Sequence, residues 1–490
     1  MATEDKFTIS PRDAEWREEL RKSKSAKERS SIPRASMPEL PAEYRITTMQ
    51  AEVNQGLSED QAVIEATRCL DCPDPGCVTG CPVGINIPGF IKNIERKNFI
   101  DAAITLKETS ALPAVCGRVC PQEKQCESKC IYNKMRKPPV AIGWLERFAA
   151  DREDDGAKQT ALPARNASNG IKVAVVGSGP AGLSFAGDMA RRGFEVTVFE
   201  VLHEIGGVLK YGIPEFRLPN EVVDKEIKAL SDMGVLFETD VLIGKTYSYD
   251  DLLNKGFKGV FVASGAGLPR FMDIPGENLI GVMSSNEYLT RINLMGAGKP
   301  GYATPILKGK NVAVIGGGNT AMDSVRTSRR MGAERAMIVY RRSEQEMPAR
   351  IEEVKHAKEE GVEFLTLHNP VEYLSDDKGR VRAMRVQRME LGEPDDSGRR
   401  SPVPVEGDIK EVPVDVVIVS VGVSPNPLIP NTISGLEVTR KGTLAVNGDL
   451  QTSIPLIYAG GDIVRGGATV ILAMGDGRQA AAAMAKMLSE

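Results

Sequence analysis

The chain has 490 residues, a formal net charge of −4 and 48 glycines. Its length exceeds that of one ordinary domain, so we expect two or three, and its nearly balanced charge gives no reason to expect a nucleic-acid or membrane-surface partner. The sequence has no apolar run of about eighteen residues and no apolar segment near its start, so we expect neither a transmembrane helix nor a secretion signal. We therefore expect a cytoplasmic location, where stable disulfides are uncommon.

Residues 1–44 are polar, charged and marked by prolines, with many Lys and Arg residues between 17 and 34. This composition predicts a polar arm, solvated or wrapped around a neighbouring domain, rather than a binding patch. The pattern then becomes helical, and Ser58 and Asp60 can cap a helix over residues 61–68.

All eight cysteines lie between positions 69 and 130, in two groups of four. The groups read Cys69-x2-Cys72-x4-Cys77-x3-Cys81-Pro82 and Cys116-x3-Cys120-Pro121-x4-Cys126-x3-Cys130. Short loops of this kind, each with a Cys-Pro step, are typical of ligands to two [4Fe–4S] clusters. Two zinc sites are the alternative, although zinc ribbons usually present two Cys-x2-Cys pairs and only one occurs here. A disulfide framework conflicts with the expected cytoplasmic location.

Helices are expected around and between these cysteine groups. Residues 87–105 indicate two short amphipathic helices that would separate and cover the clusters. Residues 138–150 lead into another helix, which contains Glu146. We expect residues 45–150 to form a helical domain and residues 151–169 to be a linker.

Residues 171–200 carry the pattern of a dinucleotide-binding unit. An apolar strand precedes Gly177-x-Gly179-x-x-Gly182, and a small-residue helix and a second strand ending at Glu200 follow. The glycines allow a tight turn, close approach of a pyrophosphate and close helix packing, and the helix N-terminus favours phosphate. Glu200 can accept hydrogen bonds from a ribose. The candidate residues here are Gly177, Ser178, Gly179, Pro180, Ala181, Gly182 and Glu200.

The segment 205–219 is rich in glycine and proline, and we expect a loop that lies against the same cofactor through Gly207, Leu209 and Arg217. An ordinary structural loop is the alternative. Residues 260–266 predict a buried strand that ends in small residues.

A second dinucleotide unit begins with a strand over residues 311–315. Its turn is Gly316-x-Gly318-x-x-Ala321, so its candidate residues are Gly316, Gly318, Asn319, Thr320 and Ala321. The next strand, 336–340, is followed by Arg341 and Arg342, whose charge favours a 2′-phosphate and hence NADP(H) over NAD(H). The alternatives are a solvated strand end or an NAD-type ribose contact through Glu344 or Glu346.

Residues 371–414 predict a β-meander, and residues 416–422 repeat the pattern of 260–266. The chain then returns to the first unit, since residues 456–462 predict a strand that ends in an acid. A final helix follows, whose N-terminus could stabilise negative charge on a reduced flavin. The candidate residues of this return are Gly461, Asp462, Gly467, Ala468 and Thr469.

These motifs resemble a known family. VVGSGPAGL, a distal GGD and GGGNTAMD are similar to the flavoprotein reductases with two dinucleotide folds. Together with CLDCPDPGCVTGCPVGINIPGF, CGRVCPQEKQCESKC and YRRSEQEMPAR, they resemble the small (β) subunits of NADPH-dependent glutamate synthase. That family includes the large subunit of the bifurcating NADH-dependent ferredoxin:NADP oxidoreductase and the N-terminal half of dihydropyrimidine dehydrogenase. The resemblance covers about residues 45–490.

The resemblance implies one FAD, one NADP(H) site and two [4Fe–4S] clusters. One cluster would be held by Cys69, Cys72, Cys77 and Cys130, and the other by Cys81, Cys120, Cys126 and a fourth ligand. The fourth ligand is Cys116 by spacing, or Glu146 by similarity to relatives with a non-cysteine ligand, and we prefer Glu146.

We thus expect an α/β fold, with two nested Rossmann-like domains preceded by an α-helical iron–sulfur domain. The expected boundaries are 1–44 for the arm, 45–150 for the clusters, 151–300 with 445–490 for FAD, and 301–444 for NADP(H).

The expected function is an NADPH-dependent oxidoreductase. A coenzyme delivers two electrons and clusters accept one at a time, so a flavin must lie between them. The partner would be the large glutamate synthase subunit, in a hetero-oligomer that makes glutamate. The alternative is a ferredoxin- or NAD(H)-linked NADP oxidoreductase, bifurcating or similar to sulfide dehydrogenase. A nucleotide-binding scaffold with structural zinc is a third, non-enzymatic possibility.

Overall fold

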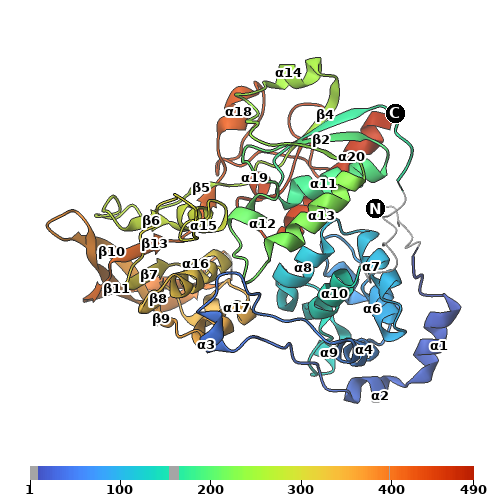
Figure 1. Cartoon of the computed structure of the whole chain (residues 1–490), viewed down its shortest axis with the longest axis horizontal. Helices are drawn as coiled ribbons and strands as arrows, with labels where there is room; N and C mark the ends of the chain where they lie inside the picture. The colour runs from blue at the N-terminus through green and yellow to red at the C-terminus, as the bar shows by residue number, and fades with distance from the viewer. Residues whose placement is uncertain (1–8, 154–164, 397, 490) are drawn as a thin grey trace.

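The computed structural model describes residues 9–153, 165–396 and 398–489, and most of the expected linker therefore lies outside the described residues. Figure 1 shows a helical N-terminal part beside two sheet-containing units. The N-terminal part consists of short helices: α1 (Glu15–Ser23), α2 (Ala26–Ser31), α3 (Ala42–Arg45), α4 (Glu59–Thr67), α5 (Gly76–Thr79), α6 (Ile87–Glu95), α7 (Phe99–Lys107), α8 (Pro113–Val119), η1 (Gln122–Lys124), η2 (Glu127–Lys129), α9 (Ile131–Lys134) and α10 (Ile142–Asp151).

Polar side chains cap three of the helices that the sequence predicted in this part. Ser58 and Gln61 form a reciprocal capping box at α4, and Asn86 and Asn98 cap α6 and α7. The apolar face of α6 is buried, so the two short amphipathic helices are confirmed.

The N-terminal arm wraps around the helical part and is less solvated than its composition suggests. Arg17 and Arg29 are buried and form ion pairs with Asp71 and Glu95. Arg21 also reaches Asp71, at 2.7 Å. Asp71 lies between Cys69 and Cys72 in the sequence, so the arm is fastened to the first cysteine loop.

The first dinucleotide unit is a parallel sheet in the order β15-β4-β1-β2-β3. The last strand of the chain pairs with β4, so the predicted return to the first unit is confirmed. Its strands are β1 (Lys172–Val176), β2 (Glu195–Phe199), β3 (Leu236–Glu238), β4 (Phe257–Val262) and β15 (Ile457–Ala459). Its helices are α11 (Pro180–Arg191), α12 (Val208–Tyr211), α13 (Asn220–Asp232), α14 (Tyr249–Asn254), α18 (Leu428–Thr432), α19 (Asp462–Arg465) and α20 (Val470–Ser489).

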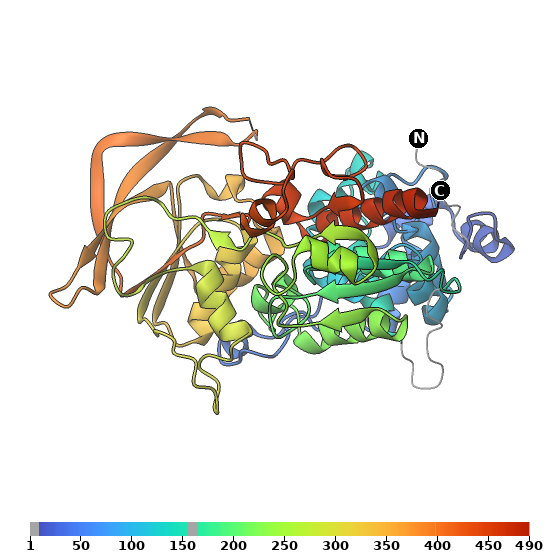
Figure 2. The ribbon, with the colours of Figure 1, turned by 90° about the horizontal axis from the view of Figure 1, so that it is seen from above.

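The second unit has a parallel sheet in the order β6-β13-β7-β8-β9 and a three-stranded antiparallel sheet, the predicted meander. The long β11–β12 hairpin projects from this unit and is the orange arm at the left of Figure 2. The strands are β6 (Val282–Ser284), β7 (Asn311–Ile315), β8 (Arg335–Tyr340), β9 (Glu363–Thr366), β10 (His368–Ser375), β11 (Val381–Pro394), β12 (Arg400–Pro413) and β13 (Val416–Val419). The helices are α15 (Ser285–Asn293), α16 (Asn319–Arg330), η3 (Glu344–Glu346) and α17 (Ile351–Glu359).

The expected boundaries at 300 and 444 are too late in the chain. Strand β6 pairs with β13 of the second sheet, so the second unit begins before residue 282. Ile429, Ile433 and Leu444 pack in the core of the first unit, so the chain has already returned by α18. The two crossings pair as the antiparallel strands β5 (Leu268–Pro269) and β14 (Val423–Ser424), which place the junction near these residues.

Among the residues that the structure describes, no helix combines the length and the apolar character needed to cross a membrane.

Candidate functional site

The two dinucleotide units and the helical part meet around one cavity of about 820 Å³. The glycine turn of the first fingerprint lines the cavity, whereas the second fingerprint contributes Asn319 and Thr320, and Gly316, Gly318 and Ala321 lie outside the wall. Val119 and Pro121 of the helical part line it as well. The predicted site residues that line it are Gly177, Gly179, Pro180, Ala181, Glu200, Gly207, Arg217, Asn319, Thr320, Gly461, Asp462, Gly467, Ala468 and Thr469. The cavity is therefore large enough and polar enough at its edges for a flavin with a second ring beside it.

The first fingerprint has the geometry that its glycines predict. Gly177 has φ +102° and a Cβ there would lie 2.5 Å from the carbonyl oxygen of Ala263. A Cβ at Gly182 would collide with the carbonyl oxygen of Gly177, so the close helix packing is confirmed. A Cβ at Gly179 would enter open space, where a pyrophosphate can approach. Among the described residues no side chain caps α11, so its N-terminal N–H groups can serve a phosphate.

Glu200 is held at the end of β2 with its carboxylate facing the cavity. Its Oε2 accepts hydrogen bonds from the backbone N–H and the hydroxyl of Ser178, at 2.9 and 2.6 Å, and Oε1 accepts from Leu202 N at 2.9 Å. Ser178, predicted as a cofactor contact, is fully buried and orients Glu200 instead. Acceptor capacity remains on the carboxylate for a ribose hydroxyl.

The return segment is fixed by a residue that the sequence reasoning missed. Asp476 of α20 accepts a hydrogen bond from Gly461 N at 2.9 Å and pairs with Arg465 at 2.6 Å. Asp462 begins α19 and accepts from Ala468 N at 2.9 Å. Burial raises the pKa of Asp462. Asp476 lies in the second turn of α20, and only its spacing from the GGD triplet could have signalled this role.

The loop 205–219 divides into cavity and core residues. Gly207 lines the cavity, whereas Leu209 is fully buried among core side chains and lies outside the cavity wall. Arg217 lines the cavity but donates a hydrogen bond of 2.8 Å to Asp323 of the second unit. Its guanidinium therefore links the two units as well as facing the cofactor site.

The second fingerprint repeats the first. Gly316 has φ +140° and a Cβ there would collide with the carbonyl oxygen of Ser420, whereas a Cβ at Gly318 would enter open space. Ala321 is fully buried in the first turn of α16, and Asn319 and Thr320 face the cavity. No side chain among the described residues caps α16, which leaves its N–H groups for a second pyrophosphate.

The two arginines after β8 have different surroundings. Arg341 is exposed, whereas Arg342 is 5% exposed, ion-paired with Asp395 and hydrogen-bonded at 2.8 Å to the carbonyl oxygen of Arg400. Arg342 therefore braces the β11–β12 hairpin against β8. Of the pair expected to bind a 2′-phosphate, Arg341 has the guanidinium that a solvent-borne phosphate can reach.

The four cysteines expected to hold one cluster come together in space and form the first ligand group: Cys69, Cys72, Cys77 and Cys130. Burial raises the pKa of the Cys77 thiol, and the charges of Cys69, Cys130 and Cys72 raise it further, so the four sulfurs are electrostatic neighbours. Cys130 reaches this group from the end of η2, although it lies far from the others in sequence. Burial also raises the pKa of Cys69 to about 11.

The second group gathers Cys81, Cys120 and Cys126 around Glu146. Burial raises the pKa of Cys126, and the nearby charges of Glu127, Glu146, Cys81 and Cys120 add to it. Glu146 is 5% exposed, and its Oε1 has no hydrogen-bond partner among the described residues. Burial, with a smaller contribution from Glu226, raises its pKa to about 8. An unpartnered buried carboxyl beside three thiols fits a ligand to a metal centre.

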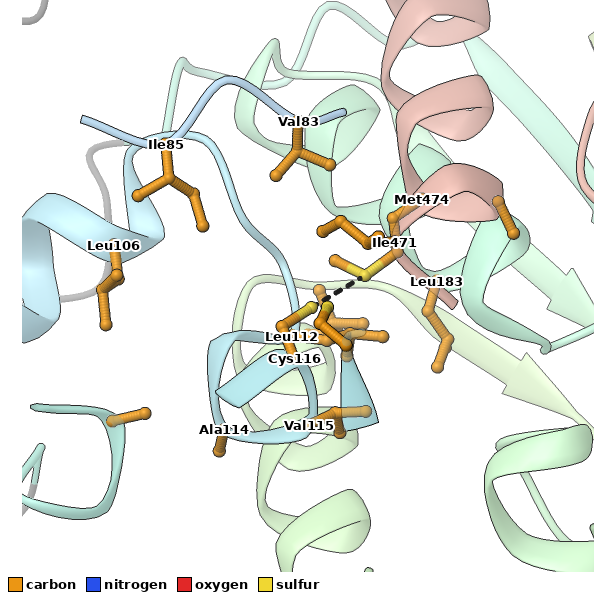
Figure 3. Packing of buried hydrophobic residues seen from close by; sticks show 14 of the residues in the cluster. Val83, Ile85, Leu106, Leu112, Ala114, Val115, Cys116, Leu183, Ile471 and Met474 are labelled. Atoms are coloured by element: carbon orange, nitrogen blue, oxygen red, sulfur yellow. Dashed lines mark hydrogen bonds between the residues drawn. The ribbon is translucent and has the colours of Figure 1, made fainter. Parts of the chain in front are cut away.

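Cys116, the other candidate fourth ligand, is buried beside Cys120. Its Sγ lies 3.4 Å from the Sδ of Met474 on α20, the dashed contact in Figure 3. The residues labelled around Cys116 in Figure 3 are apolar and include Leu112, Val115 and Ile471. A hydrogen bond with Cys120, burial and the charges of Cys120, Glu146 and Cys81 raise the pKa of the Cys116 thiol, so the structure brings Cys116 as well as Glu146 to the second group.

The spacing of the sulfurs bears on the choice between clusters and zinc. Tetrahedral zinc with Zn–S bonds of about 2.3 Å needs sulfurs within roughly 4 Å of one another. Among the described residues, which include all eight cysteines, no three cysteine sulfurs lie within 4.8 Å of one another. Wider spacing suits a cubane, whose iron atoms stand between the sulfurs.

Two family models match the two parts of the chain. Residues 45–158 match the model described as dihydropyrimidine dehydrogenase domain II, 4Fe-4S cluster. Residues 171–484 match the model described as pyridine nucleotide-disulphide oxidoreductase. The chain is 37% identical over 439 residues to the glutamate synthase (NADPH) small chain of Azospirillum brasilense, which covers 88% of this chain and 90% of that protein. The same small chain of Escherichia coli (strain K12) is 37% identical, with 92% and 96% covered.

The chain belongs to the family of the glutamate synthase (NADPH) small chains. It is an oxidoreductase with a 4Fe–4S domain before a pyridine-nucleotide domain, and the predicted family, fold class and enzyme class are confirmed. The β subunit of the NADP(+)-dependent formate dehydrogenase of Moorella thermoacetica is also 37% identical, with 84% of this chain and 60% of that protein covered. Among solved structures, Mycobacterium tuberculosis FprA in complex with NADPH shares the fold, with a TM-score of 0.56, 20% identity, and 66% and 85% of the two chains covered.

Proposed function

We propose that this chain oxidises NADPH at an FAD and passes the electrons through two [4Fe–4S] clusters to a large glutamate synthase subunit. The observation that carries the proposal is the shared cavity, whose wall contains the first fingerprint, Asn319 and Thr320 of the second, and the two neighbours of Cys120. A flavin bound there accepts two electrons together and releases them one at a time. The chain's own residues position the two dinucleotides and the segment through which the electrons would leave.

The first fingerprint and Glu200 would hold the FAD pyrophosphate and ribose, and Asp462 its ribityl chain. The second fingerprint would hold the pyrophosphate of NADPH, with Arg341 on the 2′-phosphate. Both uncapped helix N-termini face the same cavity, so a nicotinamide can lie against the flavin ring.

The electrons would leave through the segment around Cys120. Val119 and Pro121 face the cavity, and Cys120 lies between them in the second ligand group. We assign that cluster to Cys81, Cys120, Cys126 and Glu146, and the outer cluster to Cys69, Cys72, Cys77 and Cys130. The half-buried cysteines of the outer group lie nearer the surface, where a partner subunit can receive electrons.

The small-chain relatives and the formate dehydrogenase β subunit are named as parts of larger enzymes, which supports a hetero-oligomer. We also retain the expected cytoplasmic location. The test is reconstitution of the FAD- and cluster-loaded chain with a glutamate synthase large subunit from the same source. NADPH-dependent formation of glutamate from glutamine and 2-oxoglutarate would support the proposal. Turnover with ferredoxin and none with the large subunit would instead support the alternative acceptor.

A further inference from the structure

The segment from Arg118 to Gln122 is shared by three sites. Val119 and Pro121 line the flavin cavity, and Cys120 belongs to the second ligand group. The two outer residues of the segment, Arg118 and Gln122, do not line the cavity, and one side chain of the second dinucleotide unit is hydrogen-bonded to both.

That side chain is Arg350, at the start of α17. Its Nη1 donates to the carbonyl oxygen of Arg118 at 2.6 Å and its Nη2 to Oε1 of Gln122 at 2.8 Å. Arg350 is only 5% exposed, so these hydrogen bonds are little weakened by water. A planar guanidinium suits this two-point grip, because its donors point in fixed directions.

The backbone of Arg350 is bonded to the second fingerprint. Its N–H donates to Oδ1 of Asn319 at 2.8 Å, and the preceding N–H, of Ala349, donates to the carbonyl oxygen of Gly317 at 3.2 Å. Asn319 is the first residue of α16 and faces the cavity. A dinucleotide that settles on α16 therefore contacts the residues that position Arg350.

A second, weaker tie runs in parallel. The exposed Lys124 donates to the carbonyl oxygens of Pro348 and Ala349, at 3.0 and 3.3 Å. Arg350 also carries its charge close to the ligand group. Burial opposes that charge, but nearby anions outweigh burial and raise the pKa of Arg350; Glu352 is the strongest of them and Cys120 is another.

We propose that Arg350 is a positioning residue that fastens the Cys120 segment to the second fingerprint, so that NADP(H) binding is sensed at the cluster held by Cys120. The inference rests on the proposed function, since it requires a coenzyme at Asn319 and a cluster at Cys120. Coupling between two sites is reciprocal. A bound coenzyme should shift the potential of the cluster, and reduction of the cluster should change coenzyme affinity by the equivalent factor.

The experiment is a redox titration of the full chain, loaded with FAD and clusters and monitored by electron paramagnetic resonance, with and without saturating NADP⁺. We expect NADP⁺ to shift the midpoint potential of one cluster in the unmodified protein. Arg350→Gln should abolish that shift. It should also make the midpoint more negative than in Arg350→Lys, because the positive charge beside Cys120 is removed. Arg350→Lys should keep the charge but lose most of the NADP⁺-dependent shift, since an ammonium cannot reproduce the two-point grip.

Lys124→Met provides an independent test if the Arg350 variants assemble poorly. It should reduce the NADP⁺-dependent shift, whereas Lys134→Met, the same charge change at an exposed site on the same domain, should not. Equal NADP⁺-dependent shifts of the cluster potential in the unmodified protein and in Arg350→Gln would overturn the inference. A cluster potential that does not change with NADP⁺ in the unmodified protein would also overturn it. Calorimetric NADP⁺ binding and iron content are measured on the same samples. Absence of either would refute the proposed function itself, whereas their presence with no coupling refutes only this inference.

Discussion

Arg217 of the first dinucleotide unit donates a hydrogen bond of 2.8 Å to Asp323 of the second, and both side chains are buried. Phe216, next to Arg217, lies 3.8 Å beneath the guanidinium of Arg330, so the contact is part of a larger junction. The two units are thereby joined beside the cavity that their fingerprints line.

Asp323→Ala should destabilise the protein, because it leaves the buried guanidinium of Arg217 with Glu353, at 3.5 Å, as its one counter-charge among the described residues. We expect a loss of about 3–5 kcal/mol, measured from the thermal unfolding midpoint of the FAD-loaded protein. The control is Glu363→Ala, which removes the half-exposed ion pair with Arg335 and should cost below about 1 kcal/mol. Equal shifts in the two variants would show that the Arg217 contact is not structural.

Arg341→Ala should raise the Michaelis constant for NADPH and leave that for NADH nearly unchanged. A charge-assisted hydrogen bond contributes about 1.5–3 kcal/mol, which corresponds to a roughly 10- to 150-fold effect. Arg342→Ala should instead affect both coenzymes alike, because Arg342 is already paired with Asp395. Steady-state kinetics with a dye acceptor measures both. If Arg342→Ala is instead the coenzyme-selective variant, the 2′-phosphate replaces Asp395 as the partner of Arg342, and Arg342 rather than Arg341 recognises NADPH.

The purified protein should contain about eight iron and eight acid-labile sulfide per chain, as two cubanes require. Cys116→Ala should keep this content, because Cys116 packs against Met474. Glu146→Ala should lose or perturb the cluster next to the cavity. Chemical analysis of anaerobic samples, with their electron paramagnetic resonance spectra, decides the point. Iron loss in Cys116→Ala but not in Glu146→Ala would return the ligand role to the cysteine, and stoichiometric zinc would exclude clusters altogether.

The stability of the second unit should fall in acid. Burial alone would raise the pKa of Glu353 and Glu360. The charge of Arg326, with smaller contributions from neighbouring cations, outweighs burial and lowers the pKa of each to about 2, below the ordinary value of 4.5. A depressed carboxyl pKa stabilises the fold above the unfolded value, and this contribution is lost as the pH falls from about 4.5 towards 2. Each group contributes on the order of 3 kcal/mol at neutral pH.

Glu360→Gln should therefore flatten the dependence of the unfolding free energy on pH between about 5 and 3. Denaturant titrations over this range test it, with Glu406→Gln at an exposed site on β12 as the control. A slope as steep in Glu360→Gln as in the unmodified protein would mean that the Arg326 pairs do not control acid stability.

The sequence predicted the features that depend on local pattern. The strand before Gly177, the helix cap at Ser58 and the meander between the two strands of the second unit all have short-range signals, and all are present, although Asp60 lies inside the helix and does not cap it. The sequence also predicts that the second unit is inserted into the first. Residues 456–462, which contain the GGD triplet, have the pattern of a strand that ends in small residues and an acid, and this pattern indicates that the chain returns to the first unit.

Long-range pairing could not be predicted in the same way. Strand β6 has three residues and no distinctive pattern, so its place in the second sheet depends on β13, more than a hundred residues later. The separation of Arg341 from Arg342 depends on the hairpin that supplies Asp395. In the sequence, Arg350 is simply the last residue of YRRSEQEMPAR. Its hydrogen bonds to Arg118 and Gln122 form between two domains, so no local pattern could predict them.

The central claim is that electrons pass from the coenzyme to the flavin and then to the cluster held by Cys120. Stopped-flow absorbance of Cys120→Ala mixed with NADPH, with Cys116→Ala as the matched control, tests it most directly. Both variants should reduce bound flavin at the normal rate. Only Cys120→Ala should fail to reduce the cluster and lose turnover with the partner. Loss of flavin reduction in Cys120→Ala with FAD still bound, or partner turnover that survives without this cluster, would contradict the account.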